Sequence, residues 1–335
     1  MKTSSLYPAL LILSIISCLS DGISEDESKT LVRSSVPEIQ QITYLIEKDP
    51  NDAILWQQRG ILHYELQKYQ EAIGDLKKSL TLDSSKLDVW HLLADSYLDD
   101  LQSRKALETM EYASSLFPDS IRSLLKLSEF QLILRQYNSA LQSLSRIQSL
   151  DHDNADAFFM KGMVLKEVGD TLTSITQFQE ATKMNPRMAD AWINLGQLFE
   201  ARNDPDAIRY YDAGLAVDRY NTHLLHAKAQ FLGREGDVEA AKTLYGELIN
   251  IDPLSAESYY DLGLLFLDQD STVQAQQHFD LSLKINPMLA RAYFYRGWTH
   301  EILEETEAAR LDYQQALRLN KDDVDAEAGL ERLGS

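Results

Sequence analysis

The chain has 335 residues, 44% of them hydrophobic, and its 52 acidic residues against 32 basic ones give a formal net charge of −20. This acidic balance excludes the attraction to phosphate on which nucleic-acid binding depends, and it disfavours direct docking on anionic lipid. Gly and Pro are scarce, with 14 and 8 residues, and no alternating strand pattern competes with a helical period, so an all-α protein is expected.

A short apolar run lies near the N-terminus, from Leu6 to Ile16. It is too short to span a bilayer and has the length of a signal-peptide core, so residues 1–17 are expected to direct export. Cys18, the only cysteine, ends a tetrapeptide that resembles a bacterial lipobox. The resemblance implies acyl chains on Cys18 and anchorage at an outer membrane, with the periplasmic side favoured over the cell surface. The alternative is ordinary cleavage after Ser20, which would release a soluble protein.

The segment that follows the cysteine changes character at Pro37. Residues 18–36 are rich in Ser, Asp and Glu and poor in large apolar side chains, which predicts a flexible acidic tether. Residues 37–50 place Ile42, Leu45 and Ile46 where the second helix of a helical hairpin would carry them, so an N-terminal capping half-repeat is expected there.

A period of 34 residues then recurs eight times between residues 53 and 323, which predicts stacked helical hairpins. The eighth position of every repeat is small: Gly60, Ala94, Ser128, Gly162, Gly196, Ala229, Gly263 and Gly297. The twenty-fourth position is always large and mostly apolar: Leu76, Met110, Leu144, Phe178, Tyr211, Tyr245, Phe279 and Tyr313. Two helices approach closely only where a side chain is missing, so each small residue is expected to receive a large one.

On these residues the chain resembles a tetratricopeptide repeat (TPR) protein. The resemblance implies an all-α TPR α-solenoid, a right-handed superhelix of helix–turn–helix repeats. The expected repeats are 53–86, 87–120, 121–154, 155–188, 189–221, 222–255, 256–289 and 290–323. Residues 324–335 are expected to form a C-terminal solvating helix that turns Val324, Ala328 and Leu330 toward the last repeat.

In TPR folds the first helix of each pair lines the concave surface, at positions two, five, nine, twelve and thirteen of the repeat. Acidic residues outnumber basic ones at these positions, which suits a basic or amphipathic protein or peptide partner. The predicted partner-binding residues are Tyr260, Leu264, Asp268, Phe294, Trp298, Glu301, Phe159 and Met163. The alternative is that these rings pack against neighbouring helices and the acids form a solvated face.

Catalysis is not expected, because the sequence has no GxSxG, P-loop or HExxH motif and its sole cysteine lies in the signal segment. No cofactor is implied. His223 and His226 lie three residues apart on one predicted helix and are weak candidates for a transition-metal site, which would need a third ligand from elsewhere.

The combined hypothesis is a non-enzymatic, lipid-anchored TPR scaffold of a bacterial envelope that gathers protein partners. In architecture and anchor it resembles the NlpI-type and PilF-type outer-membrane adaptors. Two alternatives stay open: a structural subunit of a transport or secretion complex, and a soluble secreted or periplasmic peptide-binding protein.

Overall fold

A computed structural model describes the backbone of residues 25–334 and the side chains of residues 37–334. Within these residues every regular element is an α-helix, which confirms the all-α prediction. No helix of this part of the chain is both long and apolar enough to cross a bilayer.

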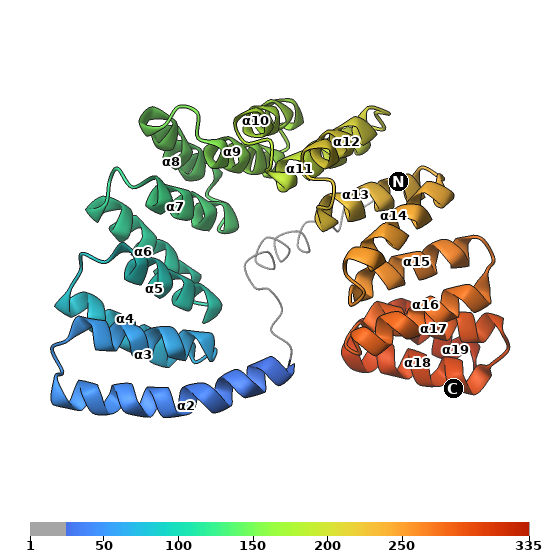
Figure 1. Cartoon of the computed structure of the whole chain (residues 1–335), viewed down its shortest axis with the longest axis horizontal. Helices are drawn as coiled ribbons and strands as arrows, with labels where there is room; N and C mark the ends of the chain where they lie inside the picture. The colour runs from blue at the N-terminus through green and yellow to red at the C-terminus, as the bar shows by residue number, and fades with distance from the viewer. Residues whose placement is uncertain (1–24, 335) are drawn as a thin grey trace. The chain divides into compact units, whose positions relative to one another are not determined.

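Eight helix pairs follow one another, each with a first helix (A) and a second helix (B), between a long N-terminal helix and a short C-terminal one (Figure 1). The N-terminal helix is α2 (Glu25–Lys48) and the C-terminal helix is α19 (Val324–Arg332). The A helices are α3 (Ala53–Glu65), α5 (Leu87–Asp99), α7 (Ile121–Ile133), α9 (Ala155–Val168), α11 (Ala189–Glu200), α13 (Thr222–Arg234), α15 (Ala256–Asp268) and α17 (Ala290–Ile302). The B helices are α4 (Tyr69–Leu82), α6 (Ser103–Leu116), α8 (Tyr137–Leu150), α10 (Thr171–Met184), α12 (Ala207–Val217), α14 (Val238–Ile251), α16 (Thr272–Ile285) and α18 (Thr306–Leu319).

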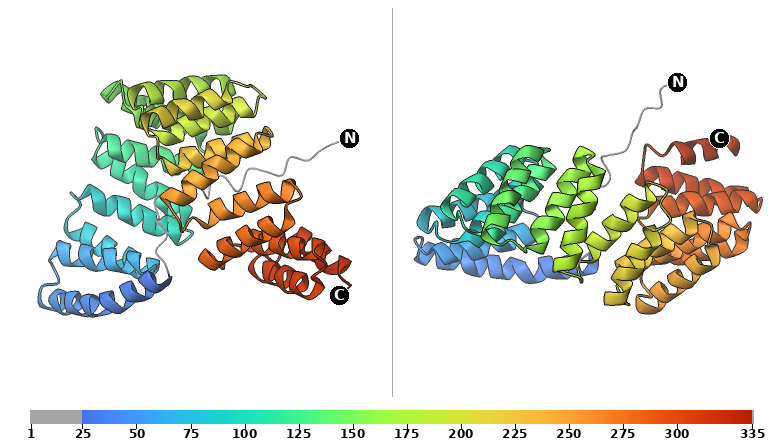
Figure 2. Two further views of the ribbon diagram at one scale, coloured as in Figure 1. Left: turned by 45° about the vertical axis from the view of Figure 1, so that its right-hand side comes forward. Right: turned by 90° about the horizontal axis from the view of Figure 1, so that it is seen from above.

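The described residues fall into two compact units that divide between Gln177 and Phe178, inside α10. In the first unit the A helices α3, α5, α7 and α9 contact one another in sequence, and in the second unit α11, α13, α15 and α17 do the same. Figure 2 shows the helices of each unit stacked one after another in chain order. Each unit therefore presents a continuous surface of A helices.

In the hairpins whose eighth residue is Gly60, Gly196, Gly263 or Gly297, this glycine lies in close contact with the large twenty-fourth residue. A Cβ built on Gly263 would lie 2.6 Å from the Phe279 ring, and one built on Gly297 would lie 3.0 Å from Tyr313. Phe279 and Tyr313 are themselves fully buried. The small residue is thus required by the ring that fills its place, as the sequence pattern predicts.

The turn inside each hairpin has a feature that the sequence pattern does not reveal. The residue at the fifteenth position of every repeat has a positive φ. In two repeats this residue is a glycine, Gly169 or Gly236. The other six are Gln67, Leu101, Arg135, Asn203, Asp270 and Glu304. Because an L-residue pays about 1–2 kcal/mol in this conformation, the packing of the two helices must fix the turn.

The two ends of the array differ in detail from expectation. The backbone of residues 25–36 belongs to α2, where a flexible tether was expected. At the other end, α19 buries Ala326 and Gly329, whereas Val324 is exposed. A Cβ on Gly329 would lie 2.6 Å from Tyr313, so this glycine lets α19 approach the last repeat.

Candidate functional site

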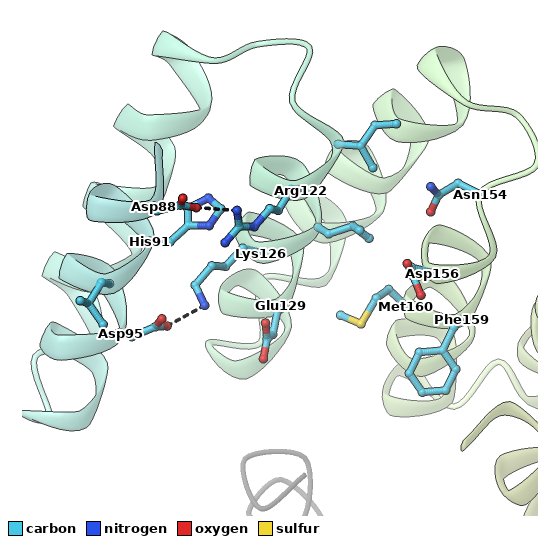
Figure 3. Close-up of a pocket in the computed structure, with 13 residues that line it drawn as sticks. Asp88, His91, Asp95, Arg122, Lys126, Glu129, Asn154, Asp156, Phe159 and Met160 are labelled. Atoms are coloured by element: carbon cyan, nitrogen blue, oxygen red, sulfur yellow. Dashed lines mark hydrogen bonds and ion pairs between the residues drawn. The ribbon is translucent and has the colours of Figure 1, made fainter. Parts of the chain in front are cut away.

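A groove of about 840 Å³ lies on the A helices of the first unit, between α5, α7 and α9 (Figure 3). Its walls carry six charged side chains, four acidic and two basic: Asp88, Asp95, Arg122, Lys126, Glu129 and Asp156. Five of them occupy the second or the ninth position of their repeats, which is where the sequence predicts inward-facing side chains. The groove is therefore acidic, and its chemistry comes from three successive repeats.

Two ion pairs join neighbouring A helices along the groove. Lys126 Nζ on α7 lies 2.8 Å from Asp95 Oδ1 on α5, with both side chains largely covered. Arg122 Nη1 lies 2.5 Å from Asp88 Oδ1, but this pair is open to solvent and contributes little to stability. Both basic groups are thus committed to carboxylates of the preceding repeat.

Glu129 lies one turn after Lys126 and lines the same groove. It is half-buried, and among the described side chains it accepts no hydrogen bond and forms no ion pair. Burial raises its pKa, the nearby Lys126 lowers it, and Asp95 raises it. Burial likewise raises the pKa of Asp95, against the opposing effect of Lys126. The groove thus holds a desolvated carboxylate that lacks a cationic partner.

His91 lies on α5 in the wall of the groove and is only 5% exposed. Burial lowers its pKa to about 4, with smaller contributions from Lys126 and Arg122, so the imidazole is neutral at pH 7. Its Nε2 atom is buried and has no hydrogen-bond partner within the part of the chain that the structure describes. An unpaired buried nitrogen of this kind costs about 1–3 kcal/mol.

Apolar side chains complete the groove: Leu92, Ile121, Leu125, Phe159 and Met160. Of the residues predicted to bind partners, Phe159 is the one that this groove contains. Met163, one turn further along α9, is 8% exposed and belongs to the core of its repeat. Its side chain is therefore not available to a partner in this conformation.

A second candidate surface lies in the second unit, where aromatic side chains of α15 and α17 form a cluster. Tyr295 contacts three of its members, with ring centroids 5.9 Å from Tyr260, 4.9 Å from Phe294 and 6.0 Å from Trp298. Phe294 also packs on Tyr313, at 5.8 Å. Trp298 remains 41% exposed, so the cluster combines internal packing with an accessible edge.

Three further residues predicted to lie at this surface have different surroundings. Glu301 accepts hydrogen bonds from Arg332 Nε and Nη2, both at 2.9 Å, and from the Tyr313 hydroxyl at 2.6 Å. The guanidinium of Arg332 holds the pKa of Glu301 below its usual range. Leu264 is half-buried and Asp268 is exposed. The contact with α19 thus accounts for Glu301 without an external partner.

The two histidines considered for a metal site do not share a third ligand. His223 is exposed, whereas His226 Nε2 lies 2.7 Å from Asp261 Oδ2. Across the described residues no group of three or more His, Cys, Asp or Glu side chains has a geometry that could hold a metal ion. Cys18, the expected lipidation site, and the signal segment lie outside the described residues.

Lys126 and Tyr295 are not among the residues predicted from the sequence, because both occupy the sixth position of their repeats. Only positions two, five, nine, twelve and thirteen are expected to face inward. A helical wheel places position six beside positions two and nine, so a wider angular sector would have included both residues. His91 was included among the inward positions, but nothing in the sequence signals that its Nε2 is buried and unpaired.

Paired helices that stack through their A helices, with a small residue against a large one in each pair, define an α-solenoid of repeats. Family models described as tetratricopeptide repeat match residues 53–86, 159–223 and 290–323. The chain therefore contains tetratricopeptide repeats.

Solved structures agree with this fold. The Cut9 and Hcn1 hetero-tetramer of the APC/C is similar with a TM-score of 0.54 and 15% identity, over 88% of this chain and 59% of that one. A tetratricopeptide repeat protein from Parabacteroides merdae has a TM-score of 0.54 and 18% identity, over 74% of this chain and 99% of that one.

Among curated proteins, DnaJ protein P58IPK homolog B of Oryza sativa is 24% identical over 86% of this chain and 70% of its own length. Other curated relatives, from fission yeast and human, are matched over 38% and 48% of their own lengths. These relatives support a repeat scaffold of the kind that binds other proteins.

Proposed function

We propose that the chain is a non-enzymatic adaptor that binds protein or peptide segments on the inward side chains of its A helices. The observation that carries this proposal is the groove between α5, α7 and α9, where three repeats together provide charged and apolar groups. Its volume of about 840 Å³ lies within the range of about 300–1,000 Å³ typical of binding pockets. The second unit adds the exposed edge of Trp298, an anchor of the kind that protein interfaces favour.

The test of this function is partner capture by the full chain from its native source. Trp298→Ala is the informative variant, because Trp298 is accessible, whereas replacing Phe294 would also remove packing on the buried Tyr313. Leu311→Ala is the matched control, since Leu311 is 62% exposed on the B helix of the same repeat. Loss of a captured partner with the first variant and not the second supports the proposal. Equal capture by both variants and the wild type removes Trp298 from the binding surface.

We further propose that the adaptor is exported and held at a membrane through lipid on Cys18, in the manner of NlpI-type and PilF-type outer-membrane adaptors. The apolar run from Leu6 to Ile16 and the single cysteine two residues after it support this proposal. Each buried CH₂ of an acyl chain contributes about 0.8 kcal/mol, so two or three chains would anchor the protein stably.

The alternative is a soluble secreted protein released by ordinary signal-peptide cleavage. The origin of the curated relatives in rice, fission yeast and human favours this second candidate, because the lipobox is a bacterial signal. The mass of the mature protein separates the two. Diacylglycerol on Cys18, with processing that globomycin blocks, supports the anchor, and an unmodified N-terminus beyond Cys18 supports the soluble form.

A further inference from the structure

We propose that the groove between α5, α7 and α9 binds a basic side chain of an extended polypeptide, with Glu129 as its counter-ion. This inference rests on the proposed function and specifies the chemistry of the partner. It follows from four properties of the groove: its charge, its unpaired carboxylate, its unpaired imidazole nitrogen and its apolar walls.

The net negative charge of the groove favours a positively charged ligand. The groove carries four carboxylates against two basic groups, and His91 adds no positive charge because its imidazole is neutral at pH 7. Lys126 and Arg122 are held by Asp95 and Asp88 of the preceding repeat. The excess negative charge therefore remains for a ligand.

Glu129 identifies where the ligand's charge would lie. A desolvated carboxylate without a cation is unfavourable, and a guanidinium or ammonium group placed beside it forms a charge-assisted hydrogen bond. Such charge-assisted bonds are stronger than hydrogen bonds between neutral groups. Glu129 is already partly removed from water, so it loses less hydration on binding than an exposed carboxylate would.

His91 and the apolar walls indicate a polypeptide and not a free polyamine. The Nε2 of His91 is buried and unpaired in the wall of the groove, and a shift of the wall would let a peptide backbone, which carries both donors and acceptors, bond to it. Leu92, Leu125 and Phe159 offer apolar area to the residues on either side of the basic one. The partner segment is thus a lysine or arginine flanked by large apolar residues.

The experiment titrates the full mature chain with three short fluorescein-labelled peptides, followed by fluorescence anisotropy. One peptide alternates lysine with leucine, one alternates glutamate with leucine, and one alternates lysine with serine. We expect the lysine–leucine peptide to bind most tightly and the glutamate–leucine peptide not to bind. Equal affinity for the lysine–leucine and lysine–serine peptides would mean nonspecific attraction to the acidic surface and would overturn the proposal.

Glu129→Gln then tests the assigned residue. Loss of one charge-assisted bond predicts binding of the lysine–leucine peptide that is weaker by about 10- to 100-fold. Glu111→Gln is the matched control, with the same change of charge on an exposed residue of α6 in the same unit, and its affinity should equal that of the wild type. Equal weakening by both variants would overturn the assignment. Because Gln removes a desolvated charge, the melting temperature of Glu129→Gln should match or exceed that of the wild type.

Carbodiimide cross-linking with peptide mapping locates the bound lysine independently. An amide bond between the peptide ammonium and the Glu129 carboxylate supports the site, and cross-links confined to acids outside the groove overturn it. Failure of this inference is distinguishable from failure of the adaptor function. If native partners are captured through Trp298 while the lysine–leucine peptide does not bind, the adaptor function stands and the basic-segment site falls.

Discussion

The A helices of the two units follow the same 34-residue pattern, but their surfaces differ in chemical character. In the first unit the A helices leave a charged groove in which Glu129 and His91 lack partners. In the second unit the corresponding helices carry Tyr260, Phe294, Tyr295 and Trp298, whose rings fill the surface by contacting one another. The repeat pattern specifies the small and large residues that pack between helices. It does not specify the inward-facing residues of the A helices, which therefore differ between the two units.

The first and last repeats also share a trio of arginine, histidine and aspartate at positions seven, eleven and twenty-three, of which the aspartate is buried. In the first repeat Arg59 donates two hydrogen bonds of 2.7 Å to Asp75, and His63 Nδ1 lies 3.1 Å from the same carboxylate. In the last repeat Arg296 donates two bonds of 2.7 Å to Asp312. Each trio joins the A helix to the B helix of its repeat.

The largest expected effect separates these two trios. Asp75→Ala should destabilise the first unit by about 3–5 kcal/mol, because Arg59 would lose its carboxylate and keep only the neutral Thr43 hydroxyl as a hydrogen-bond partner. Asp312→Ala should cost less, because Arg296 Nη1 still donates to Asp280 at 2.8 Å. Urea unfolding followed by circular dichroism gives the total loss, and hydrogen exchange of α3 and α17 shows where it occurs. Equal losses in the two variants would contradict this ranking.

Acid should weaken the first unit through His91. Its folded pKa of about 4 lies below the ordinary value of 6.5, so the unfolded chain binds the proton more tightly and stability falls as the pH drops from 6.5 toward 4. At pH 5 this loss is about 2 kcal/mol relative to pH 8. The raised pKa values of Asp95 and Glu129 act in the opposite direction over the lower part of this range.

The measurement compares urea unfolding of the wild type and His91→Gln at pH 8 and pH 5. The variant retains the acidic groups of the groove, so the difference between the two proteins isolates the imidazole. We expect the variant to lose about 2 kcal/mol less than the wild type between the two pH values. Parallel losses would show that His91 ionises normally in the folded chain.

Glycine substitutions test whether the helix pairs are equally tight in the two units. Gly263→Ala should destabilise by about 1–3 kcal/mol, because its Cβ would lie 2.6 Å from the rigid Phe279 ring. Gly60→Ala should cost less, since its Cβ would lie 2.9 Å from Cδ2 and Cγ of Leu76, a less severe approach than the one to Phe279. Gly246→Ala and Gly74→Ala are the controls, with open space around the new Cβ and an expected gain of about 0.5–1 kcal/mol. Thermal unfolding should rank the four variants, and a loss in either control would mean that Cβ contacts do not decide the outcome.

Much of the framework could be predicted from the sequence because it depends on contacts within one repeat. The A helices begin at Ala53, Leu87 and at the corresponding residue of each later repeat, as the spacing of small residues indicates. The surfaces depend on pairs about one repeat apart, such as Lys126 with Asp95 and Arg332 with Glu301. Those pairs are set by side-chain conformation and burial, which the period alone does not encode.

The smallest expected effect concerns the turns at position fifteen, where the units are most alike. Leu101 in the first unit has φ of 59° and is 89% exposed, so Leu101→Gly relieves the left-handed strain and loses little burial. The relief of about 1–2 kcal/mol is offset by about 0.5–1 kcal/mol for the greater conformational entropy that glycine loses on folding, leaving a net gain of up to about 1.5 kcal/mol. Glu304→Gly, with φ of 62°, should gain a similar amount in the second unit. The reverse change, Gly169→Ala at φ of 88°, should lose a comparable amount although no atom lies within 4 Å of its Cβ. Thermal melts of the three variants measure these changes. A higher melting temperature in Leu101→Gly and Glu304→Gly with a lower one in Gly169→Ala means that the turn conformation itself is strained in both units. A lower melting temperature in Leu101→Gly means that the exposed leucine side chain contributes more stability than its backbone strain removes.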